Sequence, residues 1–333
     1  MTSEGLARNS GGGIFLPLLF LACCVSAYAS LSTGGRSDVG IWGLFEDGGT
    51  GAAVMQDIRA PRTLVALCLG VNLGLAGLIL QAITRNALAS PAILGINQGA
   101  ALGLALGLVF PALGAVLDLK ALSIAGAFLA GLISFGIAGG FGGRLDSLRL
   151  VLGGVAVGAF AYALVRFTFT LEDDVARQVL RWTVGNITDV RMNEVRSIAG
   201  WSAGGLIATA LLAHRLNLMA LGEAQATGLG ADPRFTLLAG AIVAACLTGT
   251  AVAVAGPIAF TGLVVPHICR LLLGSDHRLL VPATALAGAA LMMTADAASK
   301  WLTAPIETPV GVVVALIGAP YFLYQTLFAR GLD

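Results

Sequence analysis

Charged side chains are scarce in this sequence. Asp, Glu, Lys and Arg make up 11% of the 333 residues, whereas 57% of the residues are hydrophobic. Soluble domains carry about 25% charged residues, so this chain could not hide its apolar surface from water. The formal net charge is +1 and no basic run occurs, which excludes a nucleic-acid partner. The composition therefore indicates a protein that uses membrane lipid as its solvent.

Residue types that do chemistry are few and dispersed. There are three His and five Cys, without a C-x-x-C or H-E-x-x-H motif, so neither a metal site nor a disulfide framework is expected. The two lysines, Lys120 and Lys300, follow Leu and Ser, so no phosphate-binding loop is present. Asp296 is the one acid predicted inside a span, and Glu307 lies at a span edge, whereas proton-driven carriers usually need buried acids or histidines. We expect that the chain is not an enzyme, binds no cofactor or metal, and takes its energy from another subunit.

Long apolar stretches dominate instead. A helix needs about 20 apolar residues to span a bilayer. These stretches are apolar on all sides rather than at alternate residues, which favours helices over a β-barrel. The sequence predicts one all-α transmembrane domain over residues 1–333, in which the eighth span is a broken helix because it holds Pro257 and Pro266. The approximate bounds of the ten predicted spans are 14–32, 62–83, 92–115, 119–140, 148–170, 196–213, 236–255, 257–273, 279–299 and 309–328.

Three longer polar stretches separate the spans. In residues 33–61, Pro61 is predicted to begin the helix of the second span at its first turn. Residues 171–195 are rich in charge and predict a short surface helix, and residues 214–234 predict one or two short helices outside the membrane. Apart from Arg166, the basic residues of the loops and span ends divide nine against nine between the two sides, so the positive-inside rule does not orient the chain.

Some polar residues lie within the apolar spans. For Asn72, Gln81 and Asn97, hydrogen bonds between helices are favoured over the lining of a transport path. For Arg166, an interfacial position or an ion pair with an acid of residues 172–174 is favoured over contact with an anionic cargo. His267 is expected to make a structural hydrogen bond rather than to bind a metal.

Four motifs give a more specific signal. The second span opens with R-x-P-R, and residues 84–91 read T-R-N-x-L-A-x-P. Residues 256–267 read G-P-I-x-F-x-G-L-x-V-P-H, and residues 309–320 read P-x-G-V-x-x-x-x-I-G-A-P. In this order the motifs resemble the FecCD family of ABC importer permeases, from about residue 55 to residue 328. Members of that family carry iron–siderophore complexes, haem or vitamin B12.

The resemblance implies an architecture and partners. The expected fold is a BtuC-like permease bundle of about ten helices that dimerises with a second copy or a homologue. Two copies of a separate ABC ATPase, which holds ATP and magnesium, are expected to dock on the inside, and a periplasmic binding protein on the outside. This places the chain in the bacterial inner membrane with both termini in the cytoplasm.

The resemblance also implies roles at the outer face. Arg59 and Arg62 match outer arginines that pair with acids on the binding protein, because a guanidinium suits a carboxylate. Lys300 lies four residues after Asp296, where the family commonly has Arg, so bidentate pairing is lost there. Interfacial anchoring is the alternative for all three cations.

On the inner side the resemblance marks two segments. Gly222, Glu223, Ala226, Leu229 and Gly230 match the family's coupling segment, which sits in a groove of the ATPase; a solvated loop is the alternative. Asn86 and Leu88 match a constriction near the inner mouth of the path. For Asn86, a turn cap is an equal alternative.

These observations favour a permease subunit for ferric siderophore import. A haem permease is the first alternative and a vitamin B12 permease the second. An ATPase-independent secondary carrier belongs to a different class, as does a channel or a membrane scaffold.

Overall fold

The computed structural model describes residues 4–34, 40–46, 48–142, 146–171, 173–304 and 306–328. Those residues form α-helices and short helical turns, with no β-strand among them. Within these ranges, seven helices are long and apolar enough to cross a membrane, and three more apolar helices are shorter. All ten predicted spans therefore correspond to a helix, and the predicted all-α membrane fold is confirmed.

The span helices are, in chain order, α1 (Glu4–Ser32), α3 (Ala60–Thr84), α4 (Ile96–Val109), α6 (Leu119–Ile137), α7 (Ser147–Thr168), α9 (Met192–Ala220), α11 (Pro233–Ala255), α12 (Thr261–Leu273), α13 (His277–Leu302) and α14 (Val310–Phe328). The short elements between them are η1 (Ile41–Leu44), α2 (Gly49–Val54), η2 (Met55–Arg59), η3 (Pro91–Leu94), α5 (Pro111–Val116), η4 (Gly140–Gly142), α8 (Asp173–Thr183) and α10 (Glu223–Gly228).

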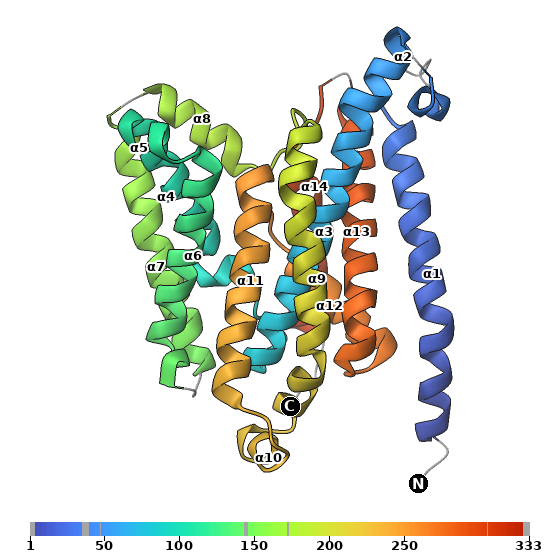
Figure 1. The fold of residues 1–333 in the computed structure, drawn as a ribbon, viewed down its shortest axis with the longest axis vertical. Helices are drawn as coiled ribbons and strands as arrows, with labels where there is room; N and C mark the ends of the chain where they lie inside the picture. Colours follow the sequence, from blue (N-terminus) through green and yellow to red (C-terminus); the bar gives the residue numbers. More distant parts are fainter. Residues whose placement is uncertain are drawn as a thin grey trace.

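Helix α3 forms the centre of the bundle (Figure 1) and packs against α9, α11, α12 and α13. Glycines permit its closest contacts, as is common between membrane helices. A Cβ atom on Gly70 would lie 2.1 Å from the Gly288 carbonyl oxygen, and one on Gly77 would lie 1.8 Å from that of Gly262. The backbones of α13 and α12 therefore lie directly against α3, which leaves no room for a side chain at these two positions.

Pro61 lies in the first turn of α3, as the sequence predicts, but the helical structure itself does not begin there. Helical structure runs without interruption from Gly49 to Thr84, through α2 and the π-helical turn η2 into α3. The Ala60 N–H donates to the Met55 carbonyl oxygen, five residues back. Proline inside a helix lacks an N–H and crowds the preceding turn, and a wider π turn accommodates such a disturbance. The helix therefore passes through Pro61.

The predicted break in the eighth span is confirmed. Helix α11 ends at Ala255, Phe260 takes the left-handed backbone conformation (φ 65°), and α12 begins at Thr261. The Ala255 carbonyl oxygen accepts the N–H of Asn186 at 2.8 Å. A backbone carbonyl at the break is thus hydrogen-bonded by another segment of the protein, as non-helical backbone at membrane depth requires. Pro266 lies within α12 and does not end it.

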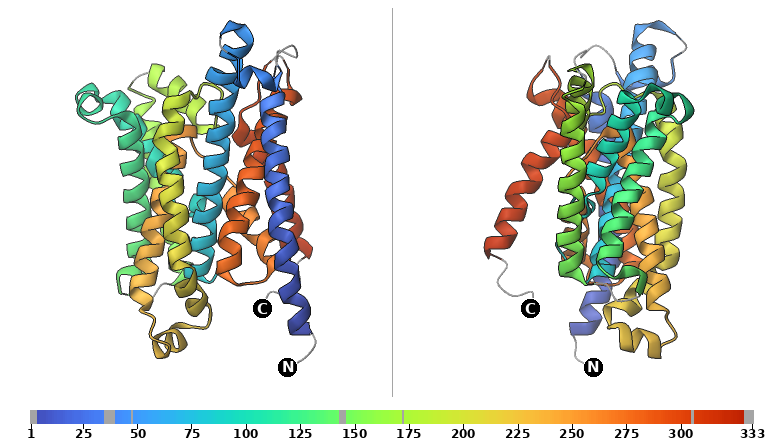
Figure 2. Two further views of the ribbon diagram at one scale, coloured as in Figure 1. Left: turned by 45° about the vertical axis from the view of Figure 1, so that its right-hand side comes forward. Right: turned by 90° about the vertical axis from the view of Figure 1, so that its left-hand side faces the viewer.

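The two ends of the bundle carry different elements. The short helix α10 projects at the end where α1 begins and α14 ends, and α2 and α8 lie at the opposite end (Figures 1 and 2). We call the first the inner end and the second the outer end. The short helices predicted within residues 171–195 and 214–234 are present as α8 and α10.

Candidate functional site

Four charged side chains meet near the outer end of α3 and α13. We call Arg62, Asp296, Lys300 and Glu307 the outer ion cluster. The Arg62 guanidinium donates through Nε to Asp296 and through Nη1 to Glu307. Lys300 Nζ lies 2.6 Å from the other Asp296 oxygen, and Asp296 is 0% exposed. Two cations and two anions balance, so no net charge is buried here.

Hydroxyl and carbonyl groups complete this cluster. Ser30 Oγ donates to Asp296 Oδ2 at 2.7 Å, and Arg62 Nη2 donates to Ser299 Oγ at 3.1 Å. Lys300 Nζ donates to the Ser30 carbonyl oxygen at 2.8 Å. A buried ion pair is tolerated when further hydrogen bonds satisfy its remaining polar atoms. The cluster meets that condition and joins α1, α3 and α13 into one unit.

Arg59 lies at the end of η2, three residues before Arg62 of the outer ion cluster. Arg59 is 4% exposed, and its Nη1 donates to the carbonyl oxygens of Leu31 and Ser32 at 3.2 and 3.4 Å. These are the last carbonyls of α1, which a positive charge stabilises through hydrogen bonds and the helix dipole. Arg59 therefore caps α1 and fixes it beside α3.

These contacts bear on the predicted docking role of Arg59, Arg62 and Lys300. The three residues are 4%, 2% and 5% exposed, and each is bonded within the chain. Direct contact with a second protein requires that one of these internal partners be displaced; Glu307, whose side chain is 31% exposed, is the most accessible acid of the cluster. Docking stays a prediction. The spacing of Asp296 and Lys300, four residues apart on a helix, was the signal for an internal pair.

The inner segment holds the residues predicted to couple to an ATPase. Helix α10 lies between two glycines with positive φ, Gly222 (109°) and Gly230 (84°). Ala226 is 0% exposed and anchors the segment, whereas Leu229 is 61% exposed. The Glu223 backbone begins α10, and its side chain lies outside the described residues. The segment therefore presents a short, well-defined helix at the inner end, and its coupling role stays a prediction.

The predicted inner mouth is a tight turn after α3. Asn86 Oδ1 accepts the Leu88 N–H at 2.9 Å, which is an Asx turn. Leu88 is 43% exposed. Sequence reasoning missed Arg85, which has φ 50° and whose Nε donates to the Met219 carbonyl oxygen at 3.1 Å. This bond joins the turn to the end of α9, directly before α10. The turn function of Asn86 is established, and its gating role stays a prediction.

Two of the three polar residues in the early spans bond between helices as predicted. Gln81 Nε2 donates to the Leu263 carbonyl oxygen at 3.2 Å, and Gln81 Oε1 accepts from Arg270 Nη1 at 3.0 Å. Asn72 Nδ2 donates to Thr250 Oγ1 at 3.3 Å. These bonds join α3 to α12 and to α11. Arg270 carried no sequence signal beyond its place near the end of a span.

Metal ligands are not gathered in the described part of the chain, where no group of three or more His, Cys, Asp or Glu is placed to hold an ion. The His267 ring lies 2.6 Å from Gln325 Nε2, which is the structural hydrogen bond predicted for it. Arg166 lies over the Tyr162 ring, with its guanidinium carbon 5.5 Å from the ring centroid. Glu172, a predicted alternative partner of Arg166, lies outside the described residues.

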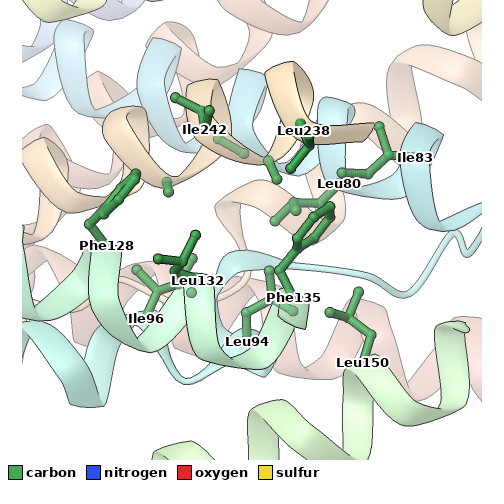
Figure 3. Close-up of a pocket in the computed structure, with 14 residues that line it drawn as sticks. Leu80, Ile83, Leu94, Ile96, Phe128, Leu132, Phe135, Leu150, Leu238 and Ile242 are labelled. Carbon is green, nitrogen blue, oxygen red and sulfur yellow. The ribbon is translucent and has the colours of Figure 1, made fainter. Parts of the chain in front are cut away.

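An apolar cavity of about 90 Å³ lies between α3, α6 and α11 (Figure 3). Leu80 and Ile83 of α3 lie beside Leu238 of α11 on one side of it, and Phe135 of α6 and Leu94 of η3 lie on the other side. All of its lining residues are apolar, and cavities of this kind stay dry. The cavity leaves free volume beside the turn and offers no polar group to a charged or oxygen-rich cargo.

Comparison with solved structures defines the class of protein. The fold is similar to an inward-facing structure of a metal-chelate type ABC transporter, with a TM-score of 0.82 and 28% identity over 95% of this chain and 99% of that chain. The class is therefore that of the helical membrane permeases of ABC transporters.

Comparison of sequences then gives the family. The FecCD transport family matches residues 18–328, and the chain belongs to it. A relative 35% identical over 96% of this chain and 84% of its own length is the iron(3+)-hydroxamate import system permease protein FhuB of Bacillus subtilis. Another, 39% identical over 83% of this chain and 84% of its own length, is the hemin transport system permease protein HmuU of Yersinia pestis. The family resemblance inferred from the four motifs is confirmed.

Proposed function

We propose that this chain is the permease subunit of an ATP-binding cassette importer that carries ferric siderophores across the bacterial inner membrane. The observation that carries the proposal is the FecCD match over residues 18–328, together with a relative named for ferric hydroxamate import. The multi-pass helical fold supports it. In this proposal the inner end, with the start of α1 and the end of α14, faces the cytoplasm.

Energy enters the proposed transporter at the inner end. Helix α10, which contains Glu223 and Ala226, and the flanking residues Gly222, Leu229 and Gly230 would fit a groove of the ATPase, with one ATPase for each of two permease copies. The ATPase would hold ATP and magnesium. The bond from Arg85 to the Met219 carbonyl oxygen supports a link from this segment to the inner mouth at Asn86 and Leu88. ATPase movement would thus reach the turn through one hydrogen bond and the last turn of α9.

At the outer end, a periplasmic binding protein would deliver the cargo. Arg59, Arg62 and Lys300 would contribute positive charge there, as proposed for docking. Because the three side chains are buried and bonded within the chain, an acid of the binding protein would have to replace Glu307 at Arg62. Docking would then exchange one carboxylate for another rather than bury an unpaired charge.

A haem permease is the second candidate, since a hemin permease is 39% identical to this chain. A vitamin B12 permease remains a third. A proton-driven carrier without an ATPase fits less well, because Asp296 is held by Arg62 and Lys300 and has no free oxygen to exchange protons. A passive channel would never raise cargo above its outside concentration, and a scaffold would give no uptake phenotype.

The test is uptake of radiolabelled iron by cells that lack this chain, with and without its restoration. Ferric hydroxamate, ferric catecholate, ferric citrate and haem are supplied separately, with labelled vitamin B12 as a further arm. We expect one ferric siderophore to be restored. Glu223→Arg should abolish that uptake with the amount of membrane protein unchanged, whereas Glu46→Arg, which makes the same change of charge at an exposed residue of the outer end, should not.

Other outcomes show which part of the proposed function fails. Rescue of haem or vitamin B12 alone would reject the siderophore and keep the importer. Uptake that survives loss of the neighbouring ATPase would reject the ATP-driven class. If uptake of none of these cargoes depends on this chain, the transport function itself is wrong.

A further inference from the structure

A polar recess of about 250 Å³ lies between α4, α7 and α8, beside the break that precedes α12. Its polar lining comes from three helices: Asn97 and Gln98 of α4, Tyr162 of α7 and Thr183 of α8. The remaining wall is apolar. It differs from the cavity of Figure 3, which offers no polar side chain. The recess therefore combines hydrogen-bonding groups with an apolar surface at membrane depth.

The amides of the recess lack internal partners. Asn97 is 9% exposed, and its side chain is not hydrogen-bonded to the described part of the chain. Gln98 Oε1 is buried without a hydrogen-bond partner. By contrast, Gln81 of α3 uses both ends of its amide to bond α12. A buried acceptor left unpaired costs free energy, so Gln98 Oε1 indicates a group that a donor on a ligand satisfies. The Asn97 amide beside it offers a further donor and a further acceptor.

The charge of the recess restricts the ligand. None of its lining residues is acidic, and the Arg166 guanidinium lies 5.5 Å from the ring centroid of Tyr162. A cation would find no counter-charge here, whereas an oxygen-rich neutral or anionic ligand would find amide and hydroxyl donors. Val165, Phe169 and Leu180 offer apolar contacts to its carbon skeleton.

The geometry points to a cargo subsite, in which the Asn97 and Gln98 amide N–H groups and the Tyr162 hydroxyl donate to peripheral oxygens of a ferric chelate, and Gln98 Oε1 accepts from one of its N–H or O–H groups. Sites for complete small molecules occupy about 300–1,000 Å³, so this recess takes one arm of the chelate. The inference rests on the proposed function and adds residues that select the cargo during its passage.

The test measures uptake kinetics of ferrichrome, a neutral hydroxamate, and of ferric dicitrate, an anion, in cells that carry the complete transporter. Asn97→Leu keeps the size of the side chain and removes its hydrogen bonds, and should raise KM about tenfold for the transported probe. Tyr162→Phe removes one hydroxyl and should raise KM by about threefold. Asn193→Leu, which makes the same substitution at an exposed residue of α9 outside the recess, is the matched control and should leave KM unchanged.

Charge substitutions separate binding from structure. For ferric dicitrate, Gln98→Glu should raise KM more than Gln98→Lys does, whereas for ferrichrome the two variants should act alike. Unchanged KM in Asn97→Leu and Tyr162→Phe, or an equal fall in maximal rate for all variants without a KM change, overturns the subsite. If the wild-type chain transports neither these probes nor any other ferric chelate, the proposed function fails first and the subsite falls with it.

Discussion

The outer and inner ends of this bundle hold their polar groups in opposite ways. At the outer end, Asp296 is 0% exposed and is bonded by Arg62, Lys300 and Ser30. At the inner end, the turn after α3 is held to α9 by the bond from Arg85 to a backbone carbonyl. Charge buried among several partners resists separation, whereas single bonds near the surface exchange readily with water. The comparison indicates a stiff outer end and, at the inner end, a turn after α3 that is able to move.

Removal of Asp296 should have the largest effect. Asp296→Ala leaves Arg62 and Lys300 buried without their shared anion, and breaking a buried pair from one side costs about 3–5 kcal/mol. We expect little folded protein in the membrane and a large fall in Tm, measured by thermal unfolding in detergent. Arg149→Ala, which breaks an exposed pair with Asp146, should change stability by about 0.5 kcal/mol at most. Equal effects of the two would contradict a stiff outer end.

A side chain introduced at Gly222 should have the second-largest effect, and it should act at the inner end. With φ 109°, this residue has a backbone that side chains rarely adopt, so Gly222→Val should cost about 1–3 kcal/mol of local strain. We expect α10 to shift and ATP-driven uptake to be lost while the fold survives. Gly200→Ala, on an exposed helical face with open space, should leave uptake intact. Preserved uptake in Gly222→Val would remove α10 from the coupling path.

Glu307 offers a smaller and more selective change. Its side chain is 31% exposed and pairs with Arg62, so Glu307→Gln should cost about 1 kcal/mol, less than a fully buried pair. It should also free part of Arg62 for an incoming carboxylate, so the binding protein should associate more tightly. Surface plasmon resonance with the purified transporter measures this. Weaker association would indicate that Glu307 itself contacts the binding protein.

The smallest effect concerns pH at the inner end. Asp276 caps α13, and hydrogen bonds from the Arg278 backbone N–H and the Asn217 amide lower the pKa of its carboxyl group. A lowered folded pKa means that the carboxylate stabilises the fold above its unfolded value near 4, a contribution lost as pH falls through the folded value. Asp276→Ala should therefore cost about 1 kcal/mol near pH 7 and less near pH 3. A difference in Tm between the unmodified chain and Asp276→Ala that grows on acidification would contradict this prediction.

Hydropathy was sufficient to locate the spans because lipid leaves a backbone few alternatives to the helix. The break at residues 256–260 was foreseen from Gly256 and Pro257. Pro61 marked the first turn of α3 but not the start of helical structure, because α2 and the π turn at residues 55–59, which precede it, carry no signal of their own in the sequence. Hydrophobic pattern thus predicts where helices lie better than where they begin.

The sequence predicted some residues of the candidate site and missed the contacts of others. The glycines around α10 marked a short helix outside the membrane, and Asn86 marked a turn. The partner of Arg85 is a backbone carbonyl, which any residue type supplies, so the sequence could not reveal it. For Arg62, a charge at a span end is compatible with an external or an internal acid, and only the fold brings Asp296 and Glu307 to it.

The most direct test of a stiff outer end and a moving inner end is a distance measurement by pulsed electron paramagnetic resonance in the complete transporter. One spin-label pair lies at the outer end, on Thr33 and Trp301, and the other at the inner end, on Leu88 and Leu229, with the native cysteines replaced. On ATP binding we predict an unchanged outer distance and a shifted inner distance. A shifted outer pair with a fixed inner pair would contradict the account.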